Sequence, residues 1–145
     1  MPDERRQRWM AVLARATAAN LDATSDGLLP EYQVLRGPES GLVMLRGRAG
    51  GNGSPFNLGE ATAVRCTVRS ADGQVGHAYC LGRDLRQAEL AAALDAALQD
   101  PARHDALQAQ VIAPLAAAQA GRREQAARRA AATQVQFFTM ATMRK

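Results

Sequence analysis

Histidine and cysteine side chains are the groups of this chain that most readily carry acid–base or nucleophilic chemistry. His77 and His104 have no carboxylate at a spacing that would pair with them, so we interpret both as packed or surface groups. Cys66 and Cys80 are too few and too far apart for a zinc or iron–sulfur motif. The chain has no Gly-x-Ser-x-Gly, His-Glu-x-x-His or Cys-x-x-Cys motif. The sequence therefore predicts no catalytic residue, bound cofactor or metal ligand.

A glycine-rich segment over residues 47–56 could cradle an anion with successive backbone N–H groups. It lacks the Lys-Ser/Thr ending of a Walker loop and the third glycine of a dinucleotide fingerprint. We therefore interpret it as a long turn between strands, in which glycine supplies unusual backbone angles. Anion binding stays open, as part of a polar or anion-binding rim that would also include charged residues near the strand ends. The candidate rim residues are Arg48, Gly50, Gly51, Gly53, Glu60, Arg65, Arg83 and Asp84. A solvated or ion-paired rim is the simpler interpretation.

Strand patterns broken by turn residues must position these groups, and they predict four antiparallel strands over residues 32–36, 41–46, 60–70 and 75–81. Asp72-Gly73 suits a two-residue type I′ turn, which would place Cys66 opposite Tyr79. In that register the core face holds Val64, Cys66, Val68, Val75, His77, Tyr79 and Leu81. Cys80 then points to the opposite face, so a disulfide is not expected. A three-residue loop would shift this register.

Helical periodicity precedes and follows the predicted strands in the sequence. Trp9, Val12, Leu13 and Ala16 form an apolar stripe within residues 3–20, and Leu90, Leu94 and Leu98 belong to a second stripe. Asp100-Pro101 resembles an N-cap followed by proline at the first helical position. Residues 116–133 predict an Ala/Arg-rich helix with few large apolar residues for packing. The expected fold is α+β, a four-stranded antiparallel sheet packed with helices, a long C-terminal helix and an extended apolar tail.

The last twelve residues contain an apolar cluster that a fraying terminus does not usually have. Phe137, Phe138 and Met140 either fold back on the chain or insert into a partner protein. The second interpretation is favoured because the preceding helix packs poorly. We therefore expect a domain over residues 1–133 and a partner-binding tail over residues 134–145.

Composition narrows the classes of function. A chain of 145 residues fits one domain, and its formal net charge is +4. The arginines are spread over several elements, without a recognition-helix motif, so nucleic acid is not the expected partner. A free-standing basic domain that binds nucleic acid or a nucleotide remains the alternative. No apolar stretch could span a bilayer and the charged N-terminus lacks a signal region, so we expect no membrane contact and a cytoplasmic location.

Several stretches, taken in their order and spacing, resemble one protein family along almost the whole chain. They include Tyr32-Gln-Val-Leu-Arg36, Arg48-Ala-Gly-Gly-Asn-Gly53, Gly82-Arg-Asp84, Val111-Ile-Ala-Pro-Leu115 and Phe137-Phe-Thr-Met140. The resemblance is to the PhnG family, the G subunits of the bacterial carbon–phosphorus lyase complex.

This resemblance implies a complex with the H, I and J subunits, of which the I subunit is the most direct partner. With the H, I and L proteins, G subunits support displacement of adenine from ATP by a phosphonate, which gives a ribose 1-phosphonate 5-triphosphate. The J subunit then breaks the carbon–phosphorus bond with an iron–sulfur cluster and S-adenosylmethionine. The resemblance assigns no catalytic residue to this chain, so an accessory subunit without independent activity is expected.

Overall fold

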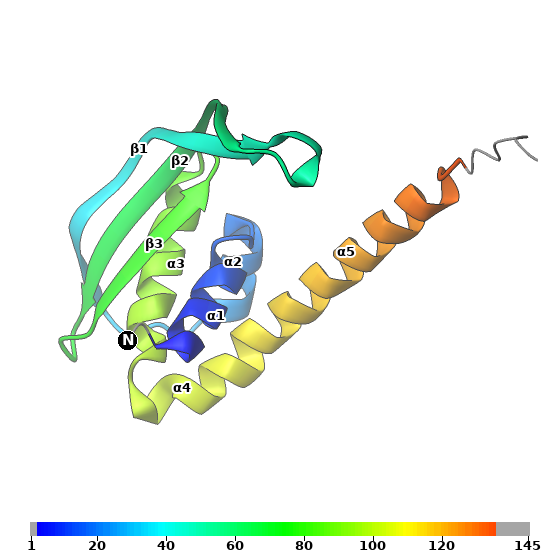
Figure 1. Cartoon of the computed structure of the whole chain (residues 1–145). Helices are drawn as coiled ribbons and strands as arrows, with labels where there is room; N and C mark the ends of the chain where they lie inside the picture. Colours follow the sequence, from blue (N-terminus) through cyan, green and yellow to red (C-terminus); the bar gives the residue numbers. More distant parts are fainter. Residues whose placement is uncertain (1–2, 136–145) are drawn as a thin grey trace, which may run out of the picture.

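The computed structural model describes residues 3–135, and Figure 1 shows how the elements are arranged. In chain order they are α1 (Glu4–Leu13), α2 (Ala18–Ser25), β1 (Tyr32–Arg48), β2 (Pro55–Ser70), β3 (Val75–Leu81), α3 (Leu85–Leu98), α4 (Pro101–Leu107) and α5 (Ala113–Ala132). A 3-10 turn over Ala49–Gly51 joins β1 to β2, and a π-helical turn over Gln108–Ile112 joins α4 to α5. The α+β class and the long C-terminal helix are confirmed.

The sheet has three antiparallel strands in the order β1-β2-β3, so the prediction of four strands is wrong. The predicted strands 32–36 and 41–46 are parts of one strand, β1, which pairs with β2. β1 passes through Gly37 and Pro38 by shifts of register on both sides of Arg36, as strands do at β-bulges. Because β1 is an edge strand, it tolerates a proline that cannot donate a hydrogen bond.

The turn between β2 and β3 has three residues, not two. The backbone N–H of Ser70 donates to the carbonyl of Gln74 at 2.9 Å, which closes a loop of Ala71, Asp72 and Gly73. Gly73 has a φ of +88°, a left-handed conformation that suits the last position of such a loop. The register therefore differs by one residue from the one predicted for a two-residue turn.

This shift moves the side chains of β3 to the other face. Cys66 lies opposite Ala78 and Val64 opposite Cys80, and all four side chains are buried. His77, Tyr79 and Leu81, which were expected in the core, lie on the exposed face of the sheet. The prediction that the two cysteines point to opposite faces is therefore wrong, because a one-residue slip inverts every side chain of a strand.

Helix α3 covers the buried face of the sheet and forms the centre of the core. It contacts all three strands and also α1, α2 and α4. Its small side chains let the helix approach β3 so closely that a Cβ at Gly76 would collide with the backbone at Ala92 and Ala96. The alanine content of the chain thus serves close packing of helix on sheet, around Leu90, Leu94 and Leu98.

The first helix is shorter than predicted. The expected helix over residues 3–20 ends at Leu13, and Thr17 begins α2 by accepting a hydrogen bond from the N–H of Asn20 at 3.2 Å. A threonine hydroxyl favours this N-cap position over the interior of a helix. Trp9 and Leu13 of the predicted stripe are buried on α1, Val12 is partly buried, and Ala16 is buried in the connection that follows the helix.

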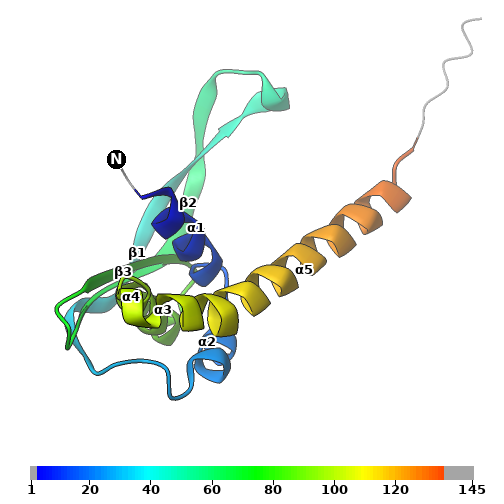
Figure 2. The same ribbon diagram turned by 90° about the horizontal axis from the view of Figure 1, so that it is seen from below.

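Two parts of the chain extend away from this core, as Figures 1 and 2 show. β3 pairs with β2 only from Ala63 onward, so the β1–β2 hairpin continues alone over residues 42–62, a segment we call the hairpin arm. The second half of α5, residues 121–132, is exposed at every position. Among the described residues, no helix is long and apolar enough to cross a membrane.

Candidate functional site

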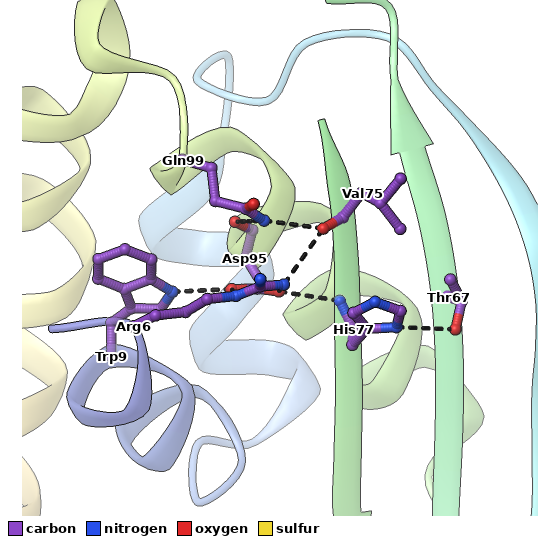
Figure 3. A network of polar contacts seen from close by, with 7 residues as sticks. All are labelled: Arg6, Trp9, Thr67, Val75, His77, Asp95 and Gln99. Atoms are coloured by element: carbon purple, nitrogen blue, oxygen red, sulfur yellow. Dashed lines mark hydrogen bonds and ion pairs between the residues drawn. The ribbon is translucent and has the colours of Figure 1, made fainter. Parts of the chain in front are cut away.

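A buried carboxylate forms the centre of the polar contacts that fix α1 to the rest of the fold (Figure 3). Asp95, on α3, is 0% exposed and accepts hydrogen bonds from Arg6 Nε at 3.2 Å, Arg6 Nη2 at 2.8 Å and Trp9 Nε1 at 2.9 Å. The backbone N–H of His77 adds a fourth donor at 2.9 Å. The hydrogen bond to Asp95 raises the pKa of Arg6 above its usual value. A buried charge with this many partners is satisfied, and its arrangement is typical of a structural role.

Three glutamines complete the attachment of the helices. Gln99 donates to the carbonyl of Val75 at 2.8 Å, next to the Asp95 contacts in Figure 3. Gln87 donates to the carbonyl of Ala16 at 2.6 Å, and Gln119 donates to the carbonyl of Val12 at 2.9 Å. The amides of Gln87 and Gln119 satisfy backbone carbonyls at and beyond the end of α1, where a helix leaves its last carbonyls without internal partners, whereas Gln99 joins α3 to β3.

A cavity of about 530 Å³ opens beside Asp95, between α1 and α4. Its polar walls include Arg6, Gln99 and His104. These side chains are already engaged, because Arg6 binds Asp95 and His104 Nδ1 lies 2.8 Å from the carbonyl of Leu98. The His104 ring also packs edge-on against Trp9, with ring centroids 5.4 Å apart. Three of the polar groups that line the cavity are therefore committed to contacts within the fold.

The remaining chemistry-bearing side chains are packed or exposed as single groups. His77 is exposed on the open face of the sheet, where Nδ1 lies 3.2 Å from the hydroxyl of Thr67. Burial raises the pKa of Cys66, and it raises the pKa of Cys80 to about 11. Both thiols are free and stay protonated at neutral pH, which removes the thiolate that nucleophilic cysteines need.

The residues of the predicted polar rim belong to separate parts of the fold. Arg48, Gly50, Gly51 and Gly53 lie at the tip of the hairpin arm, where β2 rather than a helix follows the glycines. Arg48 Nη1 donates to the carbonyl of Gly53 at 3.3 Å.

Two of the charged members of the predicted rim, Arg65 and Asp84, make contacts within the fold. Arg65 pairs with Glu39 at 2.7 Å on the open face of the sheet, and this contact lowers the pKa of Glu39. Glu60 lies in the arm, and Arg83 precedes Asp84, which caps α3 by accepting from the N–H of Gln87 at 3.1 Å. Their role in anion binding stays a prediction.

The hairpin arm exposes more large apolar surface than a single hairpin needs. Leu42 and Leu58 are each 66% exposed, Met44 is 53% exposed and Phe56 is 46% exposed. The Phe56 ring lies across Gly47, where a Cβ would be 3.6 Å from the ring. A two-stranded hairpin is marginal by itself, and clustered apolar side chains of this size mark contact surfaces.

The exposed half of α5 also has no contact with the core, although it carries no large apolar side chains. Residues 121–132 consist of alanine, arginine, glycine, glutamine and glutamate and bury nothing against the core. Isolated helices of this length are marginal in water, so such a segment is stabilised when it packs against another surface. The predicted partner-binding residues Phe137, Phe138 and Met140 lie outside the described residues.

Comparison with known proteins gives two matches along nearly the whole chain. The family model described as phosphonate metabolism protein PhnG matches residues 4–143. The chain is 48% identical over 140 residues to the alpha-D-ribose 1-methylphosphonate 5-triphosphate synthase subunit PhnG of Rhizobium meliloti, with 93% of this chain and 87% of that protein covered. Because the family model covers residues 4–143 and the relative is 48% identical over 93% of the chain, this chain belongs to the PhnG family.

Proposed function

We propose that the chain is an accessory subunit of a carbon–phosphorus lyase complex in the cytoplasm. In this role it supports the reaction that gives the relative its name, the synthesis of α-D-ribose 1-methylphosphonate 5-triphosphate. The co-substrates are ATP and a phosphonate, with adenine displaced. The partners are the H, I and J subunits, with the I subunit as the most direct one, and the L protein acts with them.

The observation that carries this proposal is the 48% identity to a named synthase subunit over nearly the whole chain. The exposed apolar side chains of the hairpin arm and the exposed half of α5 support it, because both surfaces suit contact with other proteins. The described chain thus combines a firmly packed core with two projecting surfaces.

The contribution to catalysis is positional in this proposal. Asp95, the glutamines and Asp84 hold the chain's own helices, and the thiols are buried and protonated. A subunit of this kind fixes its partners in the geometry that the reaction needs, and such positioning can contribute several kcal/mol to a barrier. The iron–sulfur cluster and S-adenosylmethionine belong to the J subunit.

The test is reconstitution from separately purified H, I and L proteins with and without this chain. Release of adenine from ATP in the presence of methylphosphonate is the measured quantity. We expect release only when the chain is added, and none from the chain alone. Adenine release by the isolated chain, or a full rate without it, would contradict an accessory role.

A further inference from the structure

A basic cleft lies between the end of α1 and the middle of α5. It has a volume of about 330 Å³ and is lined by Arg15, Gln119, Arg122, Arg123 and Ala126. Three of its five lining residues carry a positive charge and none carries a negative charge. Arg15 comes from one end of the sequence and Arg122 and Arg123 from the other, so the fold brings these charges together.

The walls of the cleft are fixed relative to each other. Gln119 Nε2 donates to the carbonyl of Val12 at 2.9 Å, and the side chain of Gln119 is buried. This bond holds α5 against α1 one turn before Arg122 and Arg123. Arg15 follows α1 directly, and its Nη1 lies 3.4 Å from the carbonyl of Ala11, which leaves its other N–H groups available.

The charge of the cleft has no counterpart within the described part of the chain. Among residues 3–135, none of the ion pairs includes Arg15, Arg122 or Arg123. The next charges on α5 do pair, since Arg128 lies 3.8 Å from Glu124. Like charges that line one hollow repel each other, and an anion in the hollow would reverse that effect.

The tip of the hairpin arm offers a weaker version of this arrangement. A hollow there is lined by Arg46, Gly47, Arg48 and Pro55. It has two guanidinium groups from one hairpin, and Arg48 already donates to the carbonyl of Gly53. The α1–α5 cleft has three guanidinium groups from two separate elements, so it is the better candidate for an anion with several charges.

We propose that the cleft between α1 and α5 binds the triphosphate group of a small phosphorylated molecule. Guanidinium groups bind phosphate oxygens through paired N–H donors, and three of them offset most of the charge of a triphosphate. This inference rests on the proposed function, because the named product of the related synthase carries a 5-triphosphate. The cleft would then hold the part of the nucleotide that the reaction leaves unchanged.

The test uses isothermal titration of the full-length chain at low ionic strength with three probes, namely inorganic tripolyphosphate, ATP and AMP. We expect saturable binding of tripolyphosphate and ATP with similar affinity, and binding of AMP at least 10-fold weaker. The double variant Arg122→Gln/Arg123→Gln should lose at least 10-fold in affinity for tripolyphosphate. Both residues are exposed, so circular dichroism should show an unchanged fold.

The matched control is Arg128→Gln/Arg129→Gln, which removes the same charge from the same helix beyond the cleft. We expect it to change the affinity less than 3-fold. Equal losses of tripolyphosphate affinity in the two double variants would show that the anion is attracted to the total charge of the helix. This result would overturn the proposal. Absence of saturable tripolyphosphate binding at millimolar concentration would also overturn it.

A second measurement separates this inference from the proposed function. Co-purification with the I subunit should be unchanged for Arg122→Gln/Arg123→Gln. If this variant loses co-purification and the native chain does not bind tripolyphosphate, the cleft is a contact for an acidic partner surface. That result would refute the triphosphate site and leave the accessory role intact. Tripolyphosphate binding by a chain that fails to assemble with any subunit would refute the proposed function alone.

Discussion

Asp95 shows how one residue can organise three elements. Its carboxylate accepts hydrogen bonds from α1 and from the backbone of β3, although it lies on α3 in the middle of the core. The contacts join residues 18 to 89 positions apart in the sequence. The charge is therefore structural, and its removal should affect folding before it affects any partner.

We predict that Asp95→Ala lowers the free energy of unfolding by about 3–5 kcal/mol, because it leaves Arg6, Trp9 and a backbone N–H without their acceptor. Urea unfolding followed by circular dichroism measures the change. The control is Arg8→Ala, which breaks an exposed pair with Glu4 and should leave stability nearly unchanged. Similar stabilities for Asp95→Ala and the control would show that the buried contacts are not needed.

Cys80 makes the stability of the chain depend on alkaline pH. Burial raises its pKa from 9.0 to about 11, so the folded state keeps a proton that the unfolded state loses. Stability from this group is fully present below pH 9 and is lost as the pH rises toward 11, by about 1.4 kcal/mol per pH unit at most.

We therefore predict a weaker decline of stability between pH 9 and 11 for Cys80→Ala than for the native chain. Urea midpoints measured across this range give the comparison. Cys80→Ala is expected to be less stable at pH 7, because it leaves a small core defect, so the slope with pH is the quantity that decides. Parallel slopes would assign the pH dependence to other groups, such as Tyr32, whose pKa burial also raises.

The sequence predicted the N-cap at Asp100 but not the contacts around Asp95. Asp100 before Pro101 has a local signature, and the structure confirms its hydrogen bond to the N–H of Ala102 at 2.9 Å. Asp95 has no such signature, since its partners come from distant segments. The available signal was the position of Asp95, a charged residue beside Leu94 on an otherwise apolar helix face. Such a position predicts a buried carboxylate with a partner, but it does not identify the partner.

Among the elements, the β1–β2 hairpin departs most from what its sequence predicts. The Gly-Pro pair favours a break, but β1 continues through it because edge strands accept bulges. The register of β3 depends on one residue of loop length, which Asp-Gly alone does not determine. The apolar stripes of the helices are easier to predict, because each stripe is indicated by several residues. The register of a strand pair depends on the length of a single turn.

We predict that Phe56→Ser/Leu58→Ser in the hairpin arm weakens assembly with the I subunit at least 10-fold. Both side chains are about half exposed or more, so the thermal melting temperature of the chain alone should change little. Co-purification of the two proteins at several concentrations measures the loss. The control is Asn57→Ser, which lies between them.

Normal assembly of the Phe56→Ser/Leu58→Ser variant would remove the arm from the interface. A large fall in its melting temperature would show that these side chains pack against the chain's own core. Either result would leave α5 and the tail as the remaining candidates for contact with partners.

As a whole, the molecule consists of a core over α1 to the first half of α5 and two projections. The sequence predicted the C-terminal projection from composition, because a helix of alanine and arginine has little to pack with. It did not predict the hairpin arm. The length over which β1 and β2 pair without a third strand depends on where β3 ends. In the structure of a single chain, a surface that contacts other subunits can be recognised only by its exposed side chains.

We predict that a chain truncated after Thr133 keeps its melting temperature and loses the I subunit. Among residues 3–135 the core residues all lie before this point, and Phe137, Phe138 and Met140 are among the large apolar groups removed. Removal of such anchors typically costs an interface about 2–4 kcal/mol or more. Thermal melting and co-purification give the two measurements.

The matched control for the truncation is a chain that ends after Met140, which keeps the three anchors. If the chain truncated after Thr133 assembles normally, the tail is not a partner contact. If it melts far below the full chain, the tail belongs to its own core.

The contacts of Asp95 also protect the sheet from unwanted association. β3 is an edge strand, and the sides of Val75 and His77 that face away from β2 would be open to another strand. The side chains of Arg6 and Gln99 donate to the carbonyl of Val75, and Asp95 accepts from the N–H of His77, so neither of these two backbone groups is free to pair with another strand. Natural sheets block their edges in comparable ways, and loss of the block favours aggregation. Variants at Asp95 should therefore precipitate at concentrations at which equally destabilised core variants stay in solution.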